Sequence, residues 1–154
     1  MSQVLNVSKD LIIYEGGETK IGTCAIIRRN GKYLLGKRSA INSKGLPRKG
    51  AGSWGLMGGK CDVGETPRAA IIREVLEECG LIVYACTFLG NYFDGEYDDY
   101  AFAVQVKDSS HLIPAEGEVD EIGWFSLNEM KSMEIFEATQ LSLDLLIKYG
   151  LIKE

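Results

Sequence analysis

The sequence contains no long run of apolar residues. Among its 154 residues there is no stretch of about 18 consecutive apolar residues, the length that a transmembrane helix needs. The first ten residues also lack the basic start and apolar segment of a secretory signal peptide. We therefore expect no membrane-spanning helix and a cytoplasmic location.

Cysteine and histidine are scarce, and their spacing does not favour a metal site. The chain has one histidine and four cysteines, none of which form a Cys-x-x-Cys pair: Cys24, Cys61, Cys79 and Cys86. A zinc site is therefore not expected. A domain of this size does not require disulfides for stability, so we expect four reduced thiols.

The chain has fewer basic than acidic residues. Seventeen basic residues against 22 acidic ones give a formal net charge of −5. A general nucleic-acid binder needs a net basic surface, so no extended nucleic-acid partner is expected. A small anionic ligand remains compatible with the sequence, because one local basic patch can bind it. The apolar content of 45% excludes a disordered chain, and the length predicts one domain over residues 1–154, with its core at about 20–147.

The first third of the chain predicts a β-hairpin. Residues Ile21–Arg28 are rich in β-branched side chains, and Lys32–Lys37 form a second apolar run. Between them lies Asn30-Gly31, a dipeptide that favours a type I′ turn. A short apolar run at Leu11–Tyr14 predicts an additional edge strand.

Residues Pro67–Cys79 predict an α-helix. Thr66 is a suitable N-cap, Pro67 stands at the first helical position, and Gly80 is placed to end the helix. The spacing of apolar residues predicts one buried stripe, made of Ala69, Ile72, Leu76 and Cys79.

Strands and one further helix are predicted after this helix. The strands cover Leu81–Leu89, Tyr100–Val106 and Ile122–Phe125, and the helix covers Glu137–Tyr149. Strands, a helix, strands and a helix in this order indicate an α/β fold with a mixed sheet between helices.

Residues 38–53 predict a loop with an unusual charge. The segment contains no acidic residue and four basic ones: Arg38, Lys44, Arg48 and Lys49. A loop of this length is either a flexible, solvated insertion or a functional segment. In the second case it would be a basic arm over an anionic ligand.

The predicted helix carries three glutamates on one face. Glu74 lies three and four positions before Glu77 and Glu78, so the carboxylates are neighbours that repel one another. One interpretation is a solvated acidic surface relieved by nearby arginines such as Arg73, which lies four positions before Glu77. The alternative is a site for a hard divalent cation such as Mg²⁺, which prefers oxygen ligands.

The spacing around these glutamates resembles the Nudix box, G-x5-E-x7-R-E-U-x-E-E-x-G-U, where U is apolar. The fixed positions are all filled, by Gly59, Glu65, Arg73, Glu74, Val75, Glu77, Glu78, Gly80 and Leu81. One departure is Met57, which stands where many Nudix proteins have proline before the double glycine. The resemblance extends over most of the chain and implies an α/β/α sandwich around a central mixed β-sheet.

The resemblance also implies a reaction and a set of site residues. Most Nudix proteins use Mg²⁺ or Mn²⁺ to hydrolyse a nucleoside diphosphate linked to another group. The implied metal ligands are Glu74, Glu77, Glu78 and the carbonyl of Gly58, while Arg73 and Glu65 would fasten the loop to the helix. The general base varies in the family, and the candidates outside the box are Glu118, Asp120 and Glu121.

The substrate is less well defined by the sequence. A short chain without an added domain resembles the MutT-like nucleoside triphosphate pyrophosphatases, and the basic loop suits a triphosphate. Tyr97 lies sixteen residues after the box, as does a tyrosine in some Nudix enzymes that cleave dinucleoside polyphosphates. Such a polyphosphate or a nucleotide sugar is the alternative substrate. A non-catalytic nucleotide-binding module is a second alternative, and a homodimer through the N-terminal segment is left open.

Overall fold

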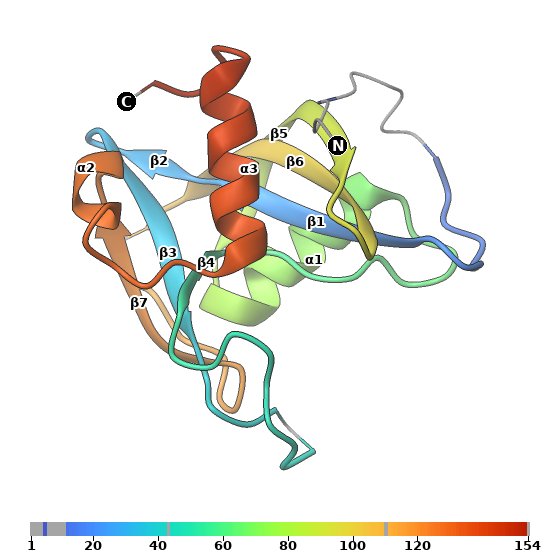
Figure 1. Cartoon of the computed structure of the whole chain (residues 1–154), viewed down its shortest axis with the longest axis horizontal. Helices are drawn as coiled ribbons and strands as arrows, with labels where there is room; N and C mark the ends of the chain where they lie inside the picture. The colour runs from blue at the N-terminus through green and yellow to red at the C-terminus, as the bar shows by residue number, and fades with distance from the viewer. Residues whose placement is uncertain (1–4, 6–11, 43, 110, 154) are drawn as a thin grey trace.

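The structure, a computed structural model, describes residues 5, 12–42, 44–109 and 111–153 as two β-sheets and three helices. In the first sheet, β1 (Lys20–Ile26) runs parallel to β6 (Tyr97–Lys107), which pairs antiparallel with β5 (Ile82–Phe93). The second sheet is antiparallel (Figure 1). Its strands are β2 (Arg28–Arg29), β3 (Lys32–Arg38), β4 (Trp54–Leu56) and β7 (Val119–Phe125).

Helices cover both faces of the mixed sheet. In Figure 1, α3 (Glu137–Lys148) lies in front of β1 and β6, and α1 (Pro67–Cys79) lies behind them. Each helix closes its own apolar cluster, one with Ile71 and Phe102 under α1 and one with Tyr92 and Leu146 under α3. The predicted α/β/α sandwich is therefore confirmed. A short helix that the sequence did not predict, α2 (Leu127–Met130), begins with a capping box at Ser126.

The predicted hairpin is present, but its first strand is divided between the sheets. Asn30 and Gly31 have φ angles of 51° and 76°, as a type I′ turn requires. The strand breaks at Ile27, where the chain passes from β1 in the mixed sheet to β2 in the antiparallel sheet. One continuous run of β-branched residues thus supplies a strand to each of the two sheets.

The edge strand predicted at Leu11–Tyr14 is wrong for residues 12–14, which are not in a strand. The backbone of Tyr14 instead bonds to the loop before α1, donating to the Glu65 carbonyl and accepting from Gly64 N–H. Leu11 lies outside the described residues, as does most of the N-terminal segment considered for a dimer contact.

The ends of α1 agree with the prediction, but its buried face does not. Thr66 caps the helix by accepting a hydrogen bond from the Ala69 N–H, and Gly80 ends it with φ of 72°. The predicted stripe is wrong for three of its four residues, because Ala69 is exposed and Ile72 and Leu76 are 40% and 53% exposed, whereas Cys79 is buried. The buried apolar side chains are Pro67, Ala70, Ile71, Val75 and Cys79.

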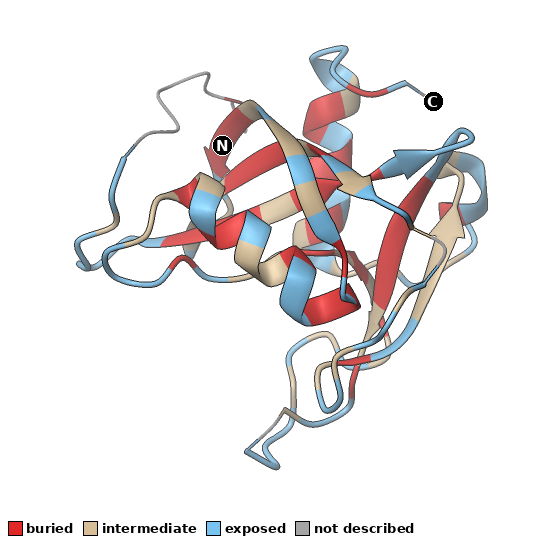
Figure 2. Cartoon of the chain, turned by 180° about the vertical axis from the view of Figure 1, so that it is seen from behind, coloured by how far each residue is buried: buried red, intermediate tan, exposed pale blue. Residues whose placement is uncertain are grey.

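Apolar residues occupy most of the circumference of α1, so their spacing alone does not select the buried side. The helix is turned so that Glu78 faces inward with Ile71 and Val75. Exposed residues consequently recur at regular intervals along the outer surface of α1 (Figure 2). Among the described residues, no helix is both long and apolar enough to cross a membrane.

A short segment after β4 joins the two sheets and positions the acidic helix. Residues 57–61 run along the free edge of β1, where the N–H of Ala25 donates to Met57 and the N–H of Thr23 donates to Gly59. The double glycine Gly58-Gly59 is thereby held between β1 and α1.

Candidate active site

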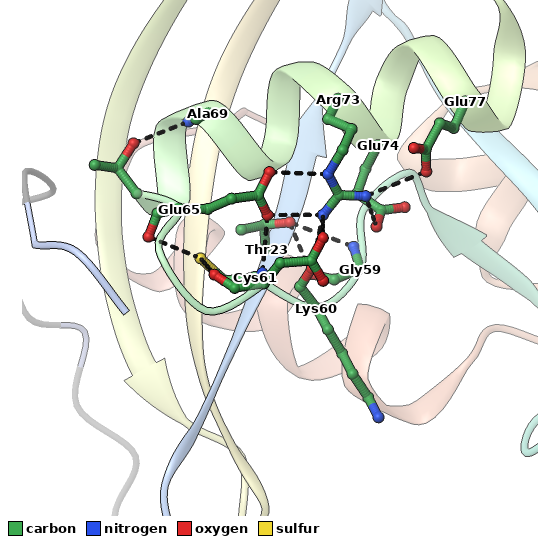
Figure 3. Close-up of polar contacts among 11 residues, drawn as sticks. Thr23, Gly59, Lys60, Cys61, Glu65, Ala69, Arg73, Glu74 and Glu77 are labelled. Carbon is green, nitrogen blue, oxygen red and sulfur yellow. Dashed lines mark hydrogen bonds and ion pairs between the residues drawn. The ribbon is translucent and has the colours of Figure 1, made fainter. Parts of the chain in front are cut away.

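One arginine organises the exposed side of α1. The Arg73 guanidinium donates to Glu65 through Nε and Nη2, both at 2.9 Å. Its Nη1 donates to Glu74 at 2.9 Å and to Glu77 at 3.2 Å, while Nη2 also reaches the Lys60 carbonyl at 3.1 Å (Figure 3). Arg73 thus ties the loop to the helix and holds two carboxylates in fixed directions.

Glu78 lies deeper than the other glutamates of the helix. It is 7% exposed, and its Oε1 accepts a hydrogen bond from the Gly58 N–H at 2.6 Å. Burial raises the pKa of Glu78 to about 8, and the charges of Glu74 and Glu118 act in the same direction. Burial also raises the pKa of Glu74, although Arg73 opposes that shift.

The double glycine is required by this packing. A Cβ atom at Gly59 would lie 2.7 Å from the carboxylate of Glu74. Gly58 has a φ of 151°, and a Cβ there would lie 2.0 Å from the Thr23 carbonyl oxygen. Only glycine lets the loop approach the two carboxylates and β1 at once.

The carboxylate donors near this loop suit a hard cation that also keeps water or substrate oxygens as ligands. Within the ranges that the structure describes, no three His, Cys, Asp or Glu side chains lie close enough together to hold a metal. Glu74 and Glu78, four residues apart on α1, both approach the double glycine. Mg²⁺ commonly binds through one or two carboxylates plus water and substrate phosphates, so this donor set suits it.

A small cleft, with room for about one water molecule, lies between Glu78 and the second sheet. Its lining residues come from β3, β4, the basic loop, α1 and the segment before β7: Gly36, Arg38, Arg48, Gly55, Leu56, Met57, Glu78, Glu118 and Val119. Of the three acids considered as general bases, the cleft contains Glu118. Asp120 and Glu121 do not line it, and Glu121 pairs with Lys37 at 3.4 Å.

Two of the predicted basic residues reach the cleft, and both are held by other groups. Arg48 donates to the carbonyl of Glu118 and lies 3.4 Å from the Ser39 hydroxyl. The guanidinium of Arg38 lies 4.0 Å from the centroid of the Phe136 ring, and its Nε donates to the Lys49 carbonyl. Burial and the neighbouring Arg48 lower the pKa of Arg38 to about 10, so it remains charged at neutral pH.

The other predicted substrate-binding residues do not line the cleft. Lys44 and Lys49 are exposed along the basic loop. Tyr97 begins β6, and its ring lies under the ammonium groups of Lys20 and Lys60. Sequence reasoning missed both of these lysines, although Lys60 directly follows the double glycine.

Sequence reasoning also missed Phe136. Its ring packs against Arg38 and lies where a side chain at Gly50 would be. No local motif marks this residue, because its role depends on a contact between segments almost 100 positions apart in the chain.

Comparison with known proteins assigns this chain to a family. The family model "NUDIX domain" matches residues 19–144. The chain therefore belongs to the Nudix family, and it is a hydrolase.

Several named proteins resemble the chain. It is 32% identical over 115 residues to an oxidized purine nucleoside triphosphate hydrolase of Danio rerio, covering 73% of this chain and 69% of the relative. It is 31% identical over 112 residues to an ADP-ribose pyrophosphatase of Methanocaldococcus jannaschii, covering 70% and 62%. The crystal structure of a MutT Nudix hydrolase from Burkholderia pseudomallei superposes with a TM-score of 0.66 at 28% identity, covering 84% and 99%.

Proposed function

We propose that this Nudix hydrolase converts a nucleoside triphosphate to a nucleoside monophosphate and pyrophosphate with the help of Mg²⁺, or of Mn²⁺ as the alternative. The observation that carries the proposal is the position of Glu78. It is buried beside the double glycine and opens into a cleft that also contains Arg38 and Arg48. The similarity to a triphosphate hydrolase of Danio rerio supports the same substrate class.

In this proposal Glu74, Glu78 and the carbonyl oxygen of Gly58 would hold the metal. Glu77, which is 54% exposed and bonded to Arg73, would have to turn towards them to join the set. When bound, a divalent cation neutralises phosphate charge and lowers the pKa of a bound water. Phosphoryl transfer depends mainly on positioning and on charge neutralisation, and the protein supplies both. The Arg73 guanidinium directs the carboxylates of Glu74 and Glu77, since it donates to each of them.

The cleft supplies the groups for the phosphate chain. Arg38 and Arg48 provide positive charge on the wall opposite α1, and a charged guanidinium matches phosphate oxygens in geometry. Glu118 is the carboxylate on this wall that can accept the proton of the attacking water. Lys44 and Lys49 would act on the phosphates only from the solvent side.

A cytoplasmic location is part of the proposal, and the four free cysteines support it.

The test is hydrolysis of a substrate panel by the purified chain, with Mg²⁺ and then with EDTA. Release of pyrophosphate from one nucleoside triphosphate, abolished by EDTA, is the expected result. Glu78→Gln should lower kcat by about 10²-fold or more, the scale of one essential catalytic group. Glu121→Gln is the matched control, because this acid pairs with Lys37 outside the cleft. Wild-type activity of Glu78→Gln would remove Glu78 from the mechanism.

A second candidate substrate is a nucleoside diphosphate linked to a sugar or to another nucleotide. The similarity to an archaeal ADP-ribose pyrophosphatase favours it. Products separate the two candidates, since these substrates yield a sugar phosphate or two nucleotides without free pyrophosphate. Turnover of such compounds alone would replace the triphosphate proposal.

A further inference from the structure

Two lysines converge on one aromatic ring next to the double glycine. The Nζ atoms of Lys20 and Lys60 lie 5.6 and 5.8 Å from the centroid of the Tyr97 ring. Neither ammonium group has an ion-pair partner among the residues that the structure describes. Both lysines are exposed, so two unpaired positive charges share one small area of a chain whose net charge is −5.

The strand register places all three side chains on one face of the mixed sheet. Lys20 on β1 is paired with Tyr97 on β6, and Gly22, two residues further along β1, is bridged to Lys60. Paired residues, and residues two apart in a strand, point to the same side of a sheet. This is the side covered by α3, because Cys24, further along the same series on β1, packs in the α3 cluster.

The neighbouring acids leave this positive charge largely uncompensated. The carboxyl of Asp99 lies over Gly22, where a Cβ atom would be 2.3 Å from Oδ1. Burial and a hydrogen bond to Asp94 raise the pKa of Asp99 to about 9, so Asp99 is neutral at pH 7. Asp94 is ionised, but it is bonded to Asp99 and to the backbone N–H groups of Glu96 and Tyr97.

Lys60 connects this face to the catalytic helix. Its carbonyl oxygen accepts a hydrogen bond from Arg73, which also holds Glu74. Figure 3 shows the side chain of Lys60 extending away from α1 and past the edge of the sheet. The lysines and the glutamates lie on opposite sides of the sheet, so a phosphate chain bound at Glu74 and Glu78 would reach Lys60 and Lys20 by passing around the glycine turn at the edge of β1.

We propose that Lys20 and Lys60, held over Tyr97, form a second anion-binding site that contacts the phosphate groups of the substrate remote from the one attacked. This inference rests on the proposed function, because it concerns the same substrate. The ring of Tyr97 serves as the apolar support that positions the two ammonium groups, rather than as a stacking surface for a base. Phosphate oxygens replace water around the ammonium groups and relieve their mutual repulsion.

The probe is inorganic tripolyphosphate, titrated calorimetrically into the full chain in EDTA, so that neither metal nor turnover contributes. Lys20→Gln and Lys60→Gln should each raise the Kd about fivefold, the range of one partly exposed charge pair, and the double variant more. Raising the salt concentration should reduce the difference between variants and wild type. Tyr97→Phe, which keeps the ring, should bind like wild type, whereas Tyr97→Leu should resemble a lysine variant.

Lys148→Gln is the matched control, because Lys148 also lies over a tyrosine ring, that of Tyr149, at 5.9 Å but far from the glycine turn. Unchanged tripolyphosphate binding in the Lys20 and Lys60 variants, or an equal loss in the control, would overturn the inference. Weaker binding in the two variants alone would support it, even if no nucleotide of the panel were hydrolysed. In that event the proposed function would fail while the anion site stood.

Discussion

At the scale of single residues, the structure separates three acidic residues that the sequence left as equal candidates for the general base. Glu118, Asp120 and Glu121 are neighbours in the chain, yet only Glu118 lines the cleft with Glu78. Glu118→Gln should lower kcat by about 10²-fold while KM changes little, because the amide keeps the volume but does not accept a proton. Steady-state kinetics across pH 6 to 9 checks this. A fall in kcat for Asp120→Asn or Glu121→Gln instead would assign the base to β7.

Asp99 sets a pH dependence of stability. Its pKa in the folded chain is raised to about 9, above the ordinary value of 3.8, so the folded state holds a proton that the unfolded state releases. Stability from this group is therefore fully present below about pH 4 and is lost as pH rises towards 9. Asp99→Asn keeps a donor for Asp94 and removes the titration. The variant's advantage over wild type should grow by about 4 kcal/mol between pH 5 and pH 8, because each pH unit in this window contributes about 1.4 kcal/mol.

Urea denaturation at the two pH values measures this difference. Asp120→Asn is the control, because Asp120 is exposed on β7 and its substitution should change stability equally at both pH values. A constant difference between Asp99→Asn and wild type from pH 5 to pH 8 would mean that Asp99 is ionised in the folded chain.

At the scale of elements, α1 shows what local sequence determines and what it leaves open. Its caps, Thr66 and Gly80, were predictable because capping depends on side chains within one turn of the helix end. Its buried face was not, because the apolar residues leave two orientations available. The choice depends on Glu78, whose hydrogen bond to Gly58 comes from a distant segment.

Adjacent isoleucines provide a direct test of this orientation. Ile71 is fully buried, whereas Ile72 is 40% exposed. Ile71→Ala should lower the free energy of unfolding by about 2–5 kcal/mol, since it opens a cavity in the core. Ile72→Ala should change it by less than about 0.5 kcal/mol. Chemical denaturation of both variants checks the prediction, and the opposite ranking would restore the face that spacing alone predicted.

At the scale of the whole molecule, the sequence located the helix that carries the candidate metal ligands, and much less of the cleft. The box residues lie within 23 positions of one another, so their helical spacing and the family resemblance were enough to place them. The cleft is assembled from β3, β4, α1 and the segment before β7. Arg38 and Arg48 were predicted because basic residues cluster in one loop. The positions of Phe136, Lys20 and Lys60 could not be predicted, because they depend on strand register and on contacts between the layers.

The attachment of the basic loop follows from this long-range packing. Phe136, just before α3, packs its ring against Arg38, and its N–H donates to the Trp54 carbonyl. Gly50 has a φ of 73°, and a Cβ atom there would lie 2.4 Å from the Phe136 ring. The ring of Phe136 therefore packs directly against Gly50 and holds the basic loop over the cleft, although the two residues are far apart in the chain.

Phe136→Ala should release Arg38 from its support and leave the carboxylates of α1 in place. We expect KM for the phosphate substrate to rise about tenfold, since a cation–π contact contributes about 1 kcal/mol and the loop also loses order. Binding of Mn²⁺ in the absence of substrate should match wild type, because Phe136 is not among the residues that line the cleft with Glu78. Gly50→Ala should reproduce the rise in KM from the other side of the contact. Weakened metal binding in Phe136→Ala would instead show that the loop and the catalytic helix are coupled through the core.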